Sequence, residues 1–508
     1  MSFFLSLYCS YSHRFRWVFC QLEVLRHCLP PSVRRTLEEL PESLDETYER
    51  VLKEIKKANR DHANRLFQCL AVAFRPLRVE ELAEALALDF DTAEGIPKLN
   101  PDWRWEDQEQ ALLATCSSLI VIINDGGHRV VQFSHFSVKE YLISDRLTTS
   151  NGDVSRYHIR LEHAHTTLAQ GCLGVLLQLD DHGMDSNTLR ARFPMVGYAS
   201  QHWFRHAQFE DVSSRIQAGM EKLFDLEKPH FAVWVQLYDT SRSLEPAAPL
   251  YYAAACGLPG LVESLLAKYP DFLHARGGSY GTALHAASLW NHVRVAQVLL
   301  EHGADIDSRG TMEWSPLHIA LGTSNLEMAQ WLLDHGADCG AEDEDGNTPL
   351  HMAATNGLIA HVRMLIERNA DISARASDGR TPLHGASNNG HLDVTRLLIE
   401  LGADVNAQAL DGRTPLYVAT NFGHSDIMRL LLEHGAEVDA QVKGRKNWAA
   451  LHQASAWGKS QVVRVLLEHG ANVDIEDADG KTPSQLAAEK GRLEVVELLA
   501  KHGSEPKT

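Results

Sequence analysis

The pattern of hydrophobic and polar residues repeats throughout the C-terminal half of the chain. Each copy begins with a polar turn, continues as a short apolar helix, and ends as a second helix that usually closes in Leu-Leu or Leu-Ile. The copies are 33 to 35 residues apart when they are aligned on one His position of the first helix. This period predicts eight helix pairs that stack on a continuous core. The aligned position holds, in order, Tyr251, His285, His318, His351, His384, Tyr417, His452 and Gln485.

Local signals place the ends of these helices. Asp378-Gly379, Asp411-Gly412 and Asp479-Gly480 are expected in hairpin turns with positive φ. Thr is expected to cap the first helix of a pair, and Pro at its first position gives up no useful N–H. Left-handed Gly caps are expected to end second helices at Gly303, Gly336, Gly402, Gly435, Gly470 and Gly503. The phrase Thr-Pro-Leu-His resembles the ankyrin repeat, which implies an α-solenoid over residues 246–508 and a protein ligand in its groove.

The N-terminal half shows helical spacing interrupted by one pair of strands. Ser43 and Glu46 are spaced as a capping box at the start of a helix. Two β-rich runs flank Asp125-Gly126-Gly127, which predicts a hairpin. Three helices followed by a hairpin make a winged helix, so the chain is expected to be mainly α. The expected helices cover residues 15–26, 40–52, 63–74, 79–86, 165–177 and 212–220, and the expected strands cover residues 118–124 and 128–133.

Four phrases of this half resemble the region that follows the nucleotide-binding domain in fungal NACHT-ankyrin proteins, which are signalling NTPases of the STAND class. These phrases lie at residues 15–19, 40–50, 75–84 and 133–142. The resemblance implies that a NACHT domain, in cis or in trans, is a partner of this chain. It also implies a helical segment at residues 14–61, a winged-helix domain at 62–150 and a helical linker domain at 151–245, with residues 1–13 unassigned.

In such proteins the NACHT domain binds ATP or ADP, the winged helix folds against it, and the repeats sense a ligand or hold the switch off. The resemblance therefore implies that His135 senses the nucleotide state by reaching the phosphates of bound ADP. The alternative is a His that is satisfied at the end of a hairpin strand. The sequence departs from the family because it has no Gly-x-x-x-x-Gly-Lys-Ser/Thr, which leaves either a truncated form or a misplaced start.

Composition favours a soluble interaction protein of the cytoplasm. The net charge of −19 argues against non-specific nucleic-acid binding and against anionic membrane surfaces. No apolar run is long enough to predict a membrane span. The eight Cys residues show no paired spacing, which favours reduced thiols in the cytosol.

Three patterns that suggest chemistry have structural explanations. The periodic His is expected to hydrogen-bond within and between repeats, since Tyr417 and Gln485 replace it. Residues 277–281 fit Gly-x-Ser-x-Gly, yet they fall at a hairpin tip rather than at a strand-to-helix elbow. Lys459 and Lys481 each follow a Gly but lack the earlier Gly of a P-loop. We therefore expect no enzyme activity, no cofactor and no metal.

Three aromatic residues mark a candidate ligand-binding groove on the repeats. Trp290, Phe422 and Trp457 stand five positions after the repeat His position, and Thr or Asn fills that place in the repeats between them. Aromatic side chains at solvent-facing positions are frequent anchors of interfaces. Partial burial against the next repeat is the alternative.

Two classes of function remain open at this point. The first is a protein-binding module, the sensor or regulatory half of a STAND-type receptor in innate immunity, with non-self recognition or programmed cell death as its output. The second is an ankyrin scaffold or a winged-helix DNA-binding regulator. DNA binding needs Arg, Lys, Asn or Gln on the groove helix, and the helix at residues 79–86 offers Glu80, Glu81 and Glu84 instead.

Overall fold

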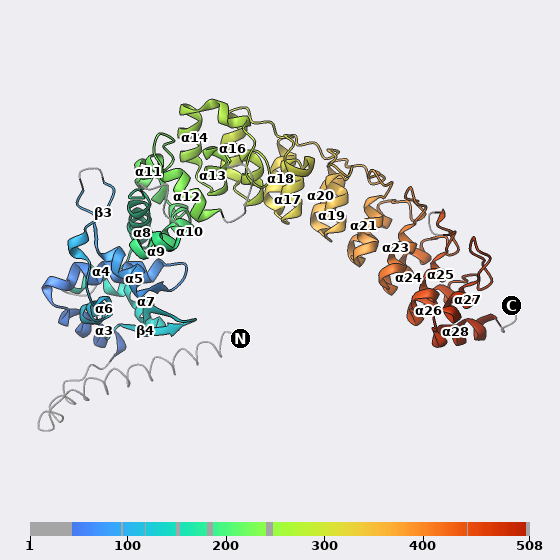
Figure 1. Ribbon diagram of the computed structural model, residues 1–508, viewed down its shortest axis with the longest axis horizontal. Helices are drawn as coiled ribbons and strands as arrows, with labels where there is room; N and C mark the ends of the chain where they lie inside the picture. Colours follow the sequence, from blue (N-terminus) through green and yellow to red (C-terminus); the bar gives the residue numbers. More distant parts are fainter. Residues whose placement is uncertain are drawn as a thin grey trace, which may run out of the picture. The chain divides into compact units, whose positions relative to one another are not determined.

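The computed structural model describes residues 43–92, 95–116, 118–148, 153–179, 186–239, 247–443 and 446–503. The chain divides into two compact units, Met1–Arg242 and Ser243–Thr508 (Figure 1). The expected helix at residues 15–26 and the unassigned tail at residues 1–13 lie outside the described residues.

The N-terminal unit begins with a winged helix, as the sequence predicts. Its helices are α3 (Leu44–Glu54), α4 (Arg60–Val72), α5 (Val79–Leu86) and α6 (Gln108–Cys116). The Oγ of Ser43 accepts a hydrogen bond from the backbone N–H of Glu46 at 3.2 Å, so the expected N-cap of α3 is present. Leu66 and Phe67 of α4 are fully buried, and burial of such a side chain contributes about 1.5–3 kcal/mol.

A small antiparallel sheet completes this fold. Its strands are β1 (Leu77–Arg78), β4 (Ile120–Asp125) and β5 (His128–Phe133), in the order β1-β5-β4. The turn between β4 and β5 uses Gly126 and Gly127 at positive φ, as expected of a tight hairpin. The helix directly before this hairpin is α6, so α6 rather than α5 takes the place of the groove helix in a winged helix.

Helix α6 and two further features of this fold were not expected from the sequence. A short hairpin of β2 (Leu88–Asp89) and β3 (Lys98–Leu99) is inserted between α5 and α6. Helix α7 (Phe136–Ile143) follows β5 and packs against α3, where Tyr48 and Tyr141 have ring centroids 5.4 Å apart. The 3-10 turns of this unit are Lys57–Asn59, Pro101–Trp103, Asp145–Leu147 and Asp153–Tyr157.

Five helices form the rest of the unit. The two that the sequence predicts are α8 (Leu161–Leu176) and α11 (Val212–Leu223). The other three are α9 (Ser186–Arg192), α10 (Val196–Ala207) and α12 (His230–Tyr238). Helix α8 packs on α4, α10 and α11, so the winged helix and the helices after it share one compact unit.

The second unit is a stack of eight helix pairs, which confirms the expected ankyrin solenoid (Figure 1). Each inner helix packs on the inner helix of the next repeat, and each outer helix packs on the next outer helix. The inner helices are α13 (Pro249–Ala255), α15 (Ala283–Leu289), α17 (Pro316–Gly322), α19 (Pro349–Thr355), α21 (Pro382–Asn389), α23 (Pro415–Phe422), α25 (Ala450–Trp457) and α27 (Pro483–Glu489). The outer helices are α14 (Pro259–Lys268), α16 (Val293–Glu301), α18 (Leu326–Asp334), α20 (Ile359–Glu367), α22 (Leu392–Glu400), α24 (Ser425–Glu433), α26 (Ser460–Glu468) and α28 (Leu493–Gly503). Two 3-10 turns, Pro270–His274 and Thr311–Glu313, lie in the connections of this unit.

Most expected caps and turns of the repeats are present, with one exception. Gly303, Gly336, Gly402, Gly435 and Gly470 all have positive φ, as do the three predicted hairpin glycines. Gly503 was expected to be a left-handed cap, but it is the last residue of α28 and is not among the residues with positive φ. In the fourth repeat Asn369, at φ 63°, takes the left-handed place of the Gly.

The periodic His side chains hydrogen-bond within and between repeats, as expected. In the second repeat the Nδ1 of His285 accepts from the backbone N–H of Thr282 at 3.2 Å, and its Nε2 donates to the carbonyl oxygen of Trp314 at 2.9 Å. The same pair of bonds is made by His318, His351, His384 and His452. These rings are neutral, because burial lowers their pKa values.

Acidification is therefore expected to destabilise the repeats. Burial lowers the pKa of His285 and of His384 to about 4. The unfolded chain takes up a proton near pH 6.5, whereas the folded rings do so only near pH 4. The contribution of the two neutral rings to the free energy of unfolding is complete above pH 6.5 and is lost as the pH falls toward 4. At pH 5 each ring lowers the free energy of unfolding by about 2 kcal/mol.

Urea denaturation at pH 7.5 and pH 5.0 measures this loss. The matched variant carries His285→Gln and His384→Gln, because Gln485 in the last repeat already accepts the same hydrogen bond, from the N–H of Thr482 at 3.0 Å. We expect the variant to lose less stability than the wild type between the two pH values. An equal loss of stability in both proteins would show that the His285 and His384 rings do not cause the acid sensitivity.

Candidate protein-binding surface

The position five residues after the repeat His lies at the C-terminal end of each inner helix. Trp290 directly follows α15, and Phe422 and Trp457 are the last residues of α23 and α25. Their side chains are 56%, 57% and 53% exposed, respectively. A residue at positive φ follows each of them, Asn291, Gly423 and Gly458, and the chain turns away there. Because each of these helices ends at this point, its aromatic side chain remains exposed.

The same position is exposed in seven of the eight repeats. It is polar and exposed at Thr323, Asn356, Asn389 and Lys490, whereas Cys256 of the first repeat is buried. We call these seven exposed residues, together with the hollow described below, the inner-helix surface. Its aromatic members fall in the second, sixth and seventh repeats.

Neighbouring side chains hold two of the aromatic residues in place. The Nζ of Lys459 lies 5.9 Å from the ring centroid of Trp457 and donates to the carbonyl oxygens of Thr420 and Asn421 in the preceding repeat. The His424 ring stacks on Phe422 with centroids 6.1 Å apart, and its Nε2 donates to the carbonyl oxygen of Asn388 at 3.1 Å. These aromatic side chains are thus supported before any partner arrives, which reduces the entropy lost on binding.

A polar hollow of about 370 Å³ lies between the fourth and fifth repeats. Asp345, Asp378 and Arg380 line it from the hairpins, and Asn388 and Asn389 line it from α21. The Nδ2 of Asn389 donates to the carbonyl oxygen of Thr355 at 2.8 Å. The inner-helix surface therefore offers hydrogen-bonding groups between its aromatic ends.

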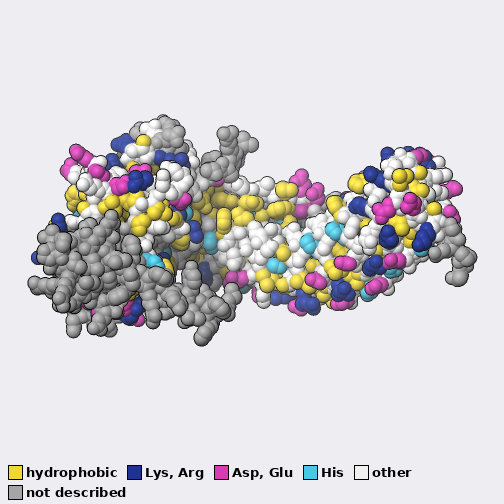
Figure 2. All heavy atoms as spheres, turned by 90° about the horizontal axis from the view of Figure 1, so that it is seen from below, with side chains coloured by type: hydrophobic (Ala, Val, Ile, Leu, Met, Phe, Trp, Pro, Cys, Tyr) yellow, Lys and Arg dark blue, Asp and Glu magenta, His cyan; other side chains and the backbone are white. Residues whose placement is uncertain are grey.

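Figure 2 shows how side chains are distributed over one face of the molecule. Hydrophobic and His side chains lie along the middle of the repeat stack, and acidic and basic side chains gather along its lower edge. Other large hydrophobic side chains are exposed in the repeats, among them Met312 at 52% and Leu410 at 79%. Single exposed apolar residues are common on protein surfaces, so these two do not by themselves mark a binding site.

His135 lies at the N-terminus of α7, in the winged helix. Its Nδ1 accepts a hydrogen bond from the backbone N–H of Ser137 at 3.2 Å and lies 2.6 Å from the Oγ of the same residue. The Oγ of Ser137 in turn lies 2.7 Å from the hydroxyl of Tyr48. His135 is therefore the N-cap of α7, a role that the sequence did not indicate. Its contact with a nucleotide stays a prediction.

Two of the three acidic residues of α5 are buried. Glu81 and Glu84 are each only 3% exposed, whereas Glu80 is exposed. Glu81 pairs with Arg75, and Glu84 pairs with Arg104 at 2.8 Å. Of these three carboxylates only that of Glu80 is therefore exposed at the surface of α5. The sequence of α6, which takes the place of the groove helix, contains neither Lys nor Arg, so it still offers no cation to a phosphate.

The Gly-x-Ser-x-Gly pattern of the sequence lies in a hairpin of the repeat unit. Residues 277–281 form a hairpin tip, in which the N–H of Gly277 donates to the carbonyl oxygen of Gly281 at 3.0 Å. Within the described residues no group of three or more His, Cys, Asp or Glu side chains could hold a metal ion. No helix in the described part of the chain is both long enough and apolar enough to cross a membrane.

Comparisons with known proteins agree with this architecture. The model of the GPI inositol-deacylase winged helix domain matches residues 48–153. The azaphilone pigments biosynthesis cluster protein L of Monascus ruber is 31% identical over 296 residues, which are 53% of this chain and 61% of that protein. The chain thus spans about three-fifths of the length of this curated relative.

Among solved structures, the ankyrin repeat domain of Bcl-3, described as a unique member of the IkappaB protein family, is 30% identical, with a TM-score of 0.39. That match covers 43% of this chain and 97% of the Bcl-3 chain. The model of ankyrin repeats matches residues 232–310, 308–376, 373–442 and 437–508, which together are more than half of the chain. The chain therefore belongs to the ankyrin-repeat family.

Proposed function

We propose that this chain binds a protein partner through the inner-helix surface of its ankyrin repeats. The observation that carries the proposal is the row of exposed residues at the ends of the inner helices, with Trp290, Phe422 and Trp457 in it. Large aromatic side chains bury much area for little lost entropy, so a few of them supply most of the affinity of an interface. The polar hollow between them supplies hydrogen bonds that select the partner.

The test begins with capture on the immobilised full-length chain, followed by identification of the bound protein. The affinity of that purified protein is then measured for the wild type and for chains altered on the inner-helix surface. Unchanged affinity after replacement of the aromatic residues would contradict the proposal.

We further infer that the chain is the sensor or regulatory half of a STAND-type signalling receptor, which works with a NACHT domain in cis or in trans. The winged helix beside a repeat array supports this role, because it is the arrangement in which repeats control a nucleotide switch. We place the protein in the cytoplasm and its output in innate immunity. The five described Cys residues, Cys69, Cys116, Cys172, Cys256 and Cys339, are free thiols, which fits a reducing compartment.

His135 is the residue that we propose to sense the nucleotide. Because its Nδ1 accepts from the Ser137 N–H, the neutral ring carries its proton on Nε2, and an N–H is the donor that a phosphate oxygen requires. Such a bond to a charged group contributes about 1.5–3 kcal/mol to the closed, ADP-bound state. His135→Ala should therefore shift a reconstituted receptor about ten- to a hundredfold toward the open state.

Oligomerisation of the reconstituted receptor without ligand measures that shift. The matched variant is His135→Asn, which keeps an N-cap acceptor for α7 but places no imidazole near the phosphate. We expect both variants to raise oligomerisation and only His135→Ala to lower the melting temperature. If His135→Asn behaved as wild type, His135 would be a structural cap and no sensor.

A further inference from the structure

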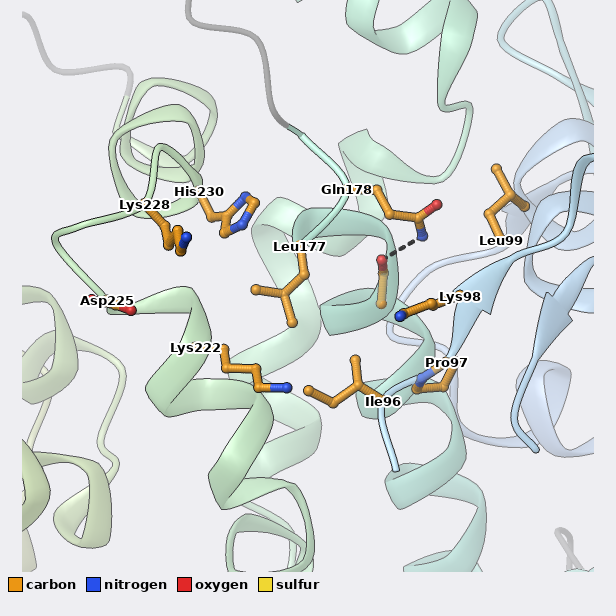
Figure 3. Close-up of a pocket in the computed structure, with 11 residues that line it drawn as sticks. Ile96, Pro97, Lys98, Leu99, Leu177, Gln178, Lys222, Asp225, Lys228 and His230 are labelled. Atoms are coloured by element: carbon orange, nitrogen blue, oxygen red, sulfur yellow. Dashed lines mark hydrogen bonds between the residues drawn. The ribbon is translucent and has the colours of Figure 1, made fainter. Parts of the chain in front are cut away.

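The N-terminal unit contains a cavity of about 440 Å³ (Figure 3), and His135 is not among the residues that line it. The β2–β3 hairpin, the C-terminal end of α8, the end of α11 and the start of α12 surround it. Its volume is within the range of about 300–1,000 Å³ that holds small organic ligands. The resemblance to NACHT proteins assigns no role to this place.

The position of the hairpin against α8 gives the cavity one fixed wall. At Gly174 of α8 a Cβ atom would overlap the carbonyl oxygen of Pro97, so the hairpin backbone lies directly on the helix. At Gly219 of α11 a Cβ atom would lie 3.0 Å from Leu173 and 3.9 Å from Ile96. Both helices thus have a Gly where the hairpin packs against them. Ile96 is only 8% exposed as a result.

The lining of the cavity combines apolar and cationic side chains. Its apolar residues are Ile96, Pro97, Leu99 and Leu177. Its cations are Lys98 of β3, Lys222 of α11 and Lys228 of the turn before α12. Figure 3 shows Lys98 and Lys222 approaching the space beside Ile96 and Leu177 from opposite directions.

Three ammonium groups around one cavity are unexpected in a chain of net charge −19. Asp225 is the one carboxylate among the described residues that line it, so the lining carries a net positive charge. Two further polar groups are held by backbone. The Nε2 of Gln178 donates to the carbonyl oxygen of Gly174 at 2.7 Å, and the Nδ1 of His230 lies 3.3 Å from the carbonyl oxygen of Leu179. The net positive charge of the lining favours an anionic ligand.

We propose that this cavity binds a small amphipathic organic anion, with its carboxylate or phosphate head at the lysines and its apolar body against Ile96, Leu99 and Leu177. An ammonium group is a compact charge that pairs with either kind of head and imposes no planar geometry on it. The apolar side chains contribute about 25 cal/mol for each Å² of ligand surface that they remove from water. Neither the lysines nor the apolar residues would select this class of ligand alone, but together they disfavour organic cations and inorganic ions.

Calorimetric titration of the full-length protein tests the proposal with four probes: octyl phosphate, octanoate, octylammonium and inorganic phosphate. We expect the two anionic octyl probes to bind, and the tighter of the two identifies the preferred head group. Raising the salt concentration should weaken them, since the Debye length falls to about 3 Å at 1 M. Octylammonium binding as tightly as the anions would overturn the proposal, and so would inorganic phosphate binding as tightly as octyl phosphate.

Variants locate the site. The double variant Lys98→Gln and Lys222→Gln should bind the preferred probe at least about tenfold more weakly, as expected when charge-assisted contacts are lost. The matched control is Lys268→Gln and Lys501→Gln, two exposed lysines of the repeat unit that change the net charge equally. Because all four side chains are exposed, the variants should melt at the wild-type temperature. Wild-type affinity in the folded Lys98 and Lys222 variant would place the ligand elsewhere and refute the site.

Discussion

Replacing Trp290 and Trp457 by Ala is expected to weaken binding of the protein partner about 30-fold for each residue, because an aromatic hot spot contributes about 2 kcal/mol or more. Both side chains are more than half exposed in the free chain, so the variants lose little of the core and should remain folded. Surface plasmon resonance with the purified partner measures the two single variants and the double variant. Since the two residues lie in the second and seventh repeats, their effects should be nearly additive.

The control for this prediction is Leu401→Ala. Leu401 is 43% exposed and directly follows the C-terminal end of the outer helix α22, so it is not part of the inner-helix surface. Its replacement removes exposed apolar area but none of the inner-helix surface, so the affinity should stay within about twofold of wild type. An equal loss in this control and in the Trp variants would show that binding depends on general exposed hydrophobicity.

Glu84→Ala is expected to destabilise the N-terminal unit by about 3 kcal/mol. The side chain of Glu84 is buried and accepts hydrogen bonds from the Met195 N–H at 2.6 Å and from Arg104 at 2.8 Å. Burial raises the pKa of this carboxyl group, while its hydrogen bonds oppose the shift. Removing the carboxylate leaves a buried N–H at the start of α10 without its acceptor.

Two matched variants separate this effect from a general loss of charge on α5. Glu80→Ala removes an exposed carboxylate from the same helix and should change stability by no more than about 0.5 kcal/mol. Glu84→Gln keeps an oxygen acceptor for the Met195 N–H, so its loss of stability should lie between those of Glu80→Ala and Glu84→Ala. Hydrogen exchange in peptides of α8 and α10, measured at increasing urea concentrations, reports on the N-terminal unit alone. Equal effects of Glu80→Ala and Glu84→Ala would contradict the assigned role.

Repetition explains why the fold of the C-terminal half could be predicted. Each ankyrin pair is set by local signals, such as the Asp378-Gly379 turn, and signals of this kind recur along the eight repeats, so one unusual copy changes little. The exception is Gly503, which is the last residue of α28. The exposure of the inner-helix ends also follows from period alone.

The N-terminal half was harder to predict because its key contacts join residues far apart in the sequence. Nothing near Glu84 indicates that its carboxylate bonds to Met195, more than one hundred residues later. The β2–β3 hairpin has only two paired residues in each strand, too few for an alternating pattern to be visible. The cationic cavity was missed for the same reason, since its three lysines come from separate elements. A signal was present in Gly174, a Gly inside a helical pattern, which often marks close packing.

Gly174 also limits how this protein can change in evolution. The carbonyl oxygen of Pro97 occupies the space that a Cβ atom at this position would need, so any other residue would displace the hairpin from α8. In related sequences, Gly at this position and the β2–β3 insertion should be gained and lost together, whereas the surrounding lysines are free to vary with whatever the cavity holds. The co-occurrence of one Gly and one short insertion would thus trace the history of the cavity in genomes whose proteins have never been purified.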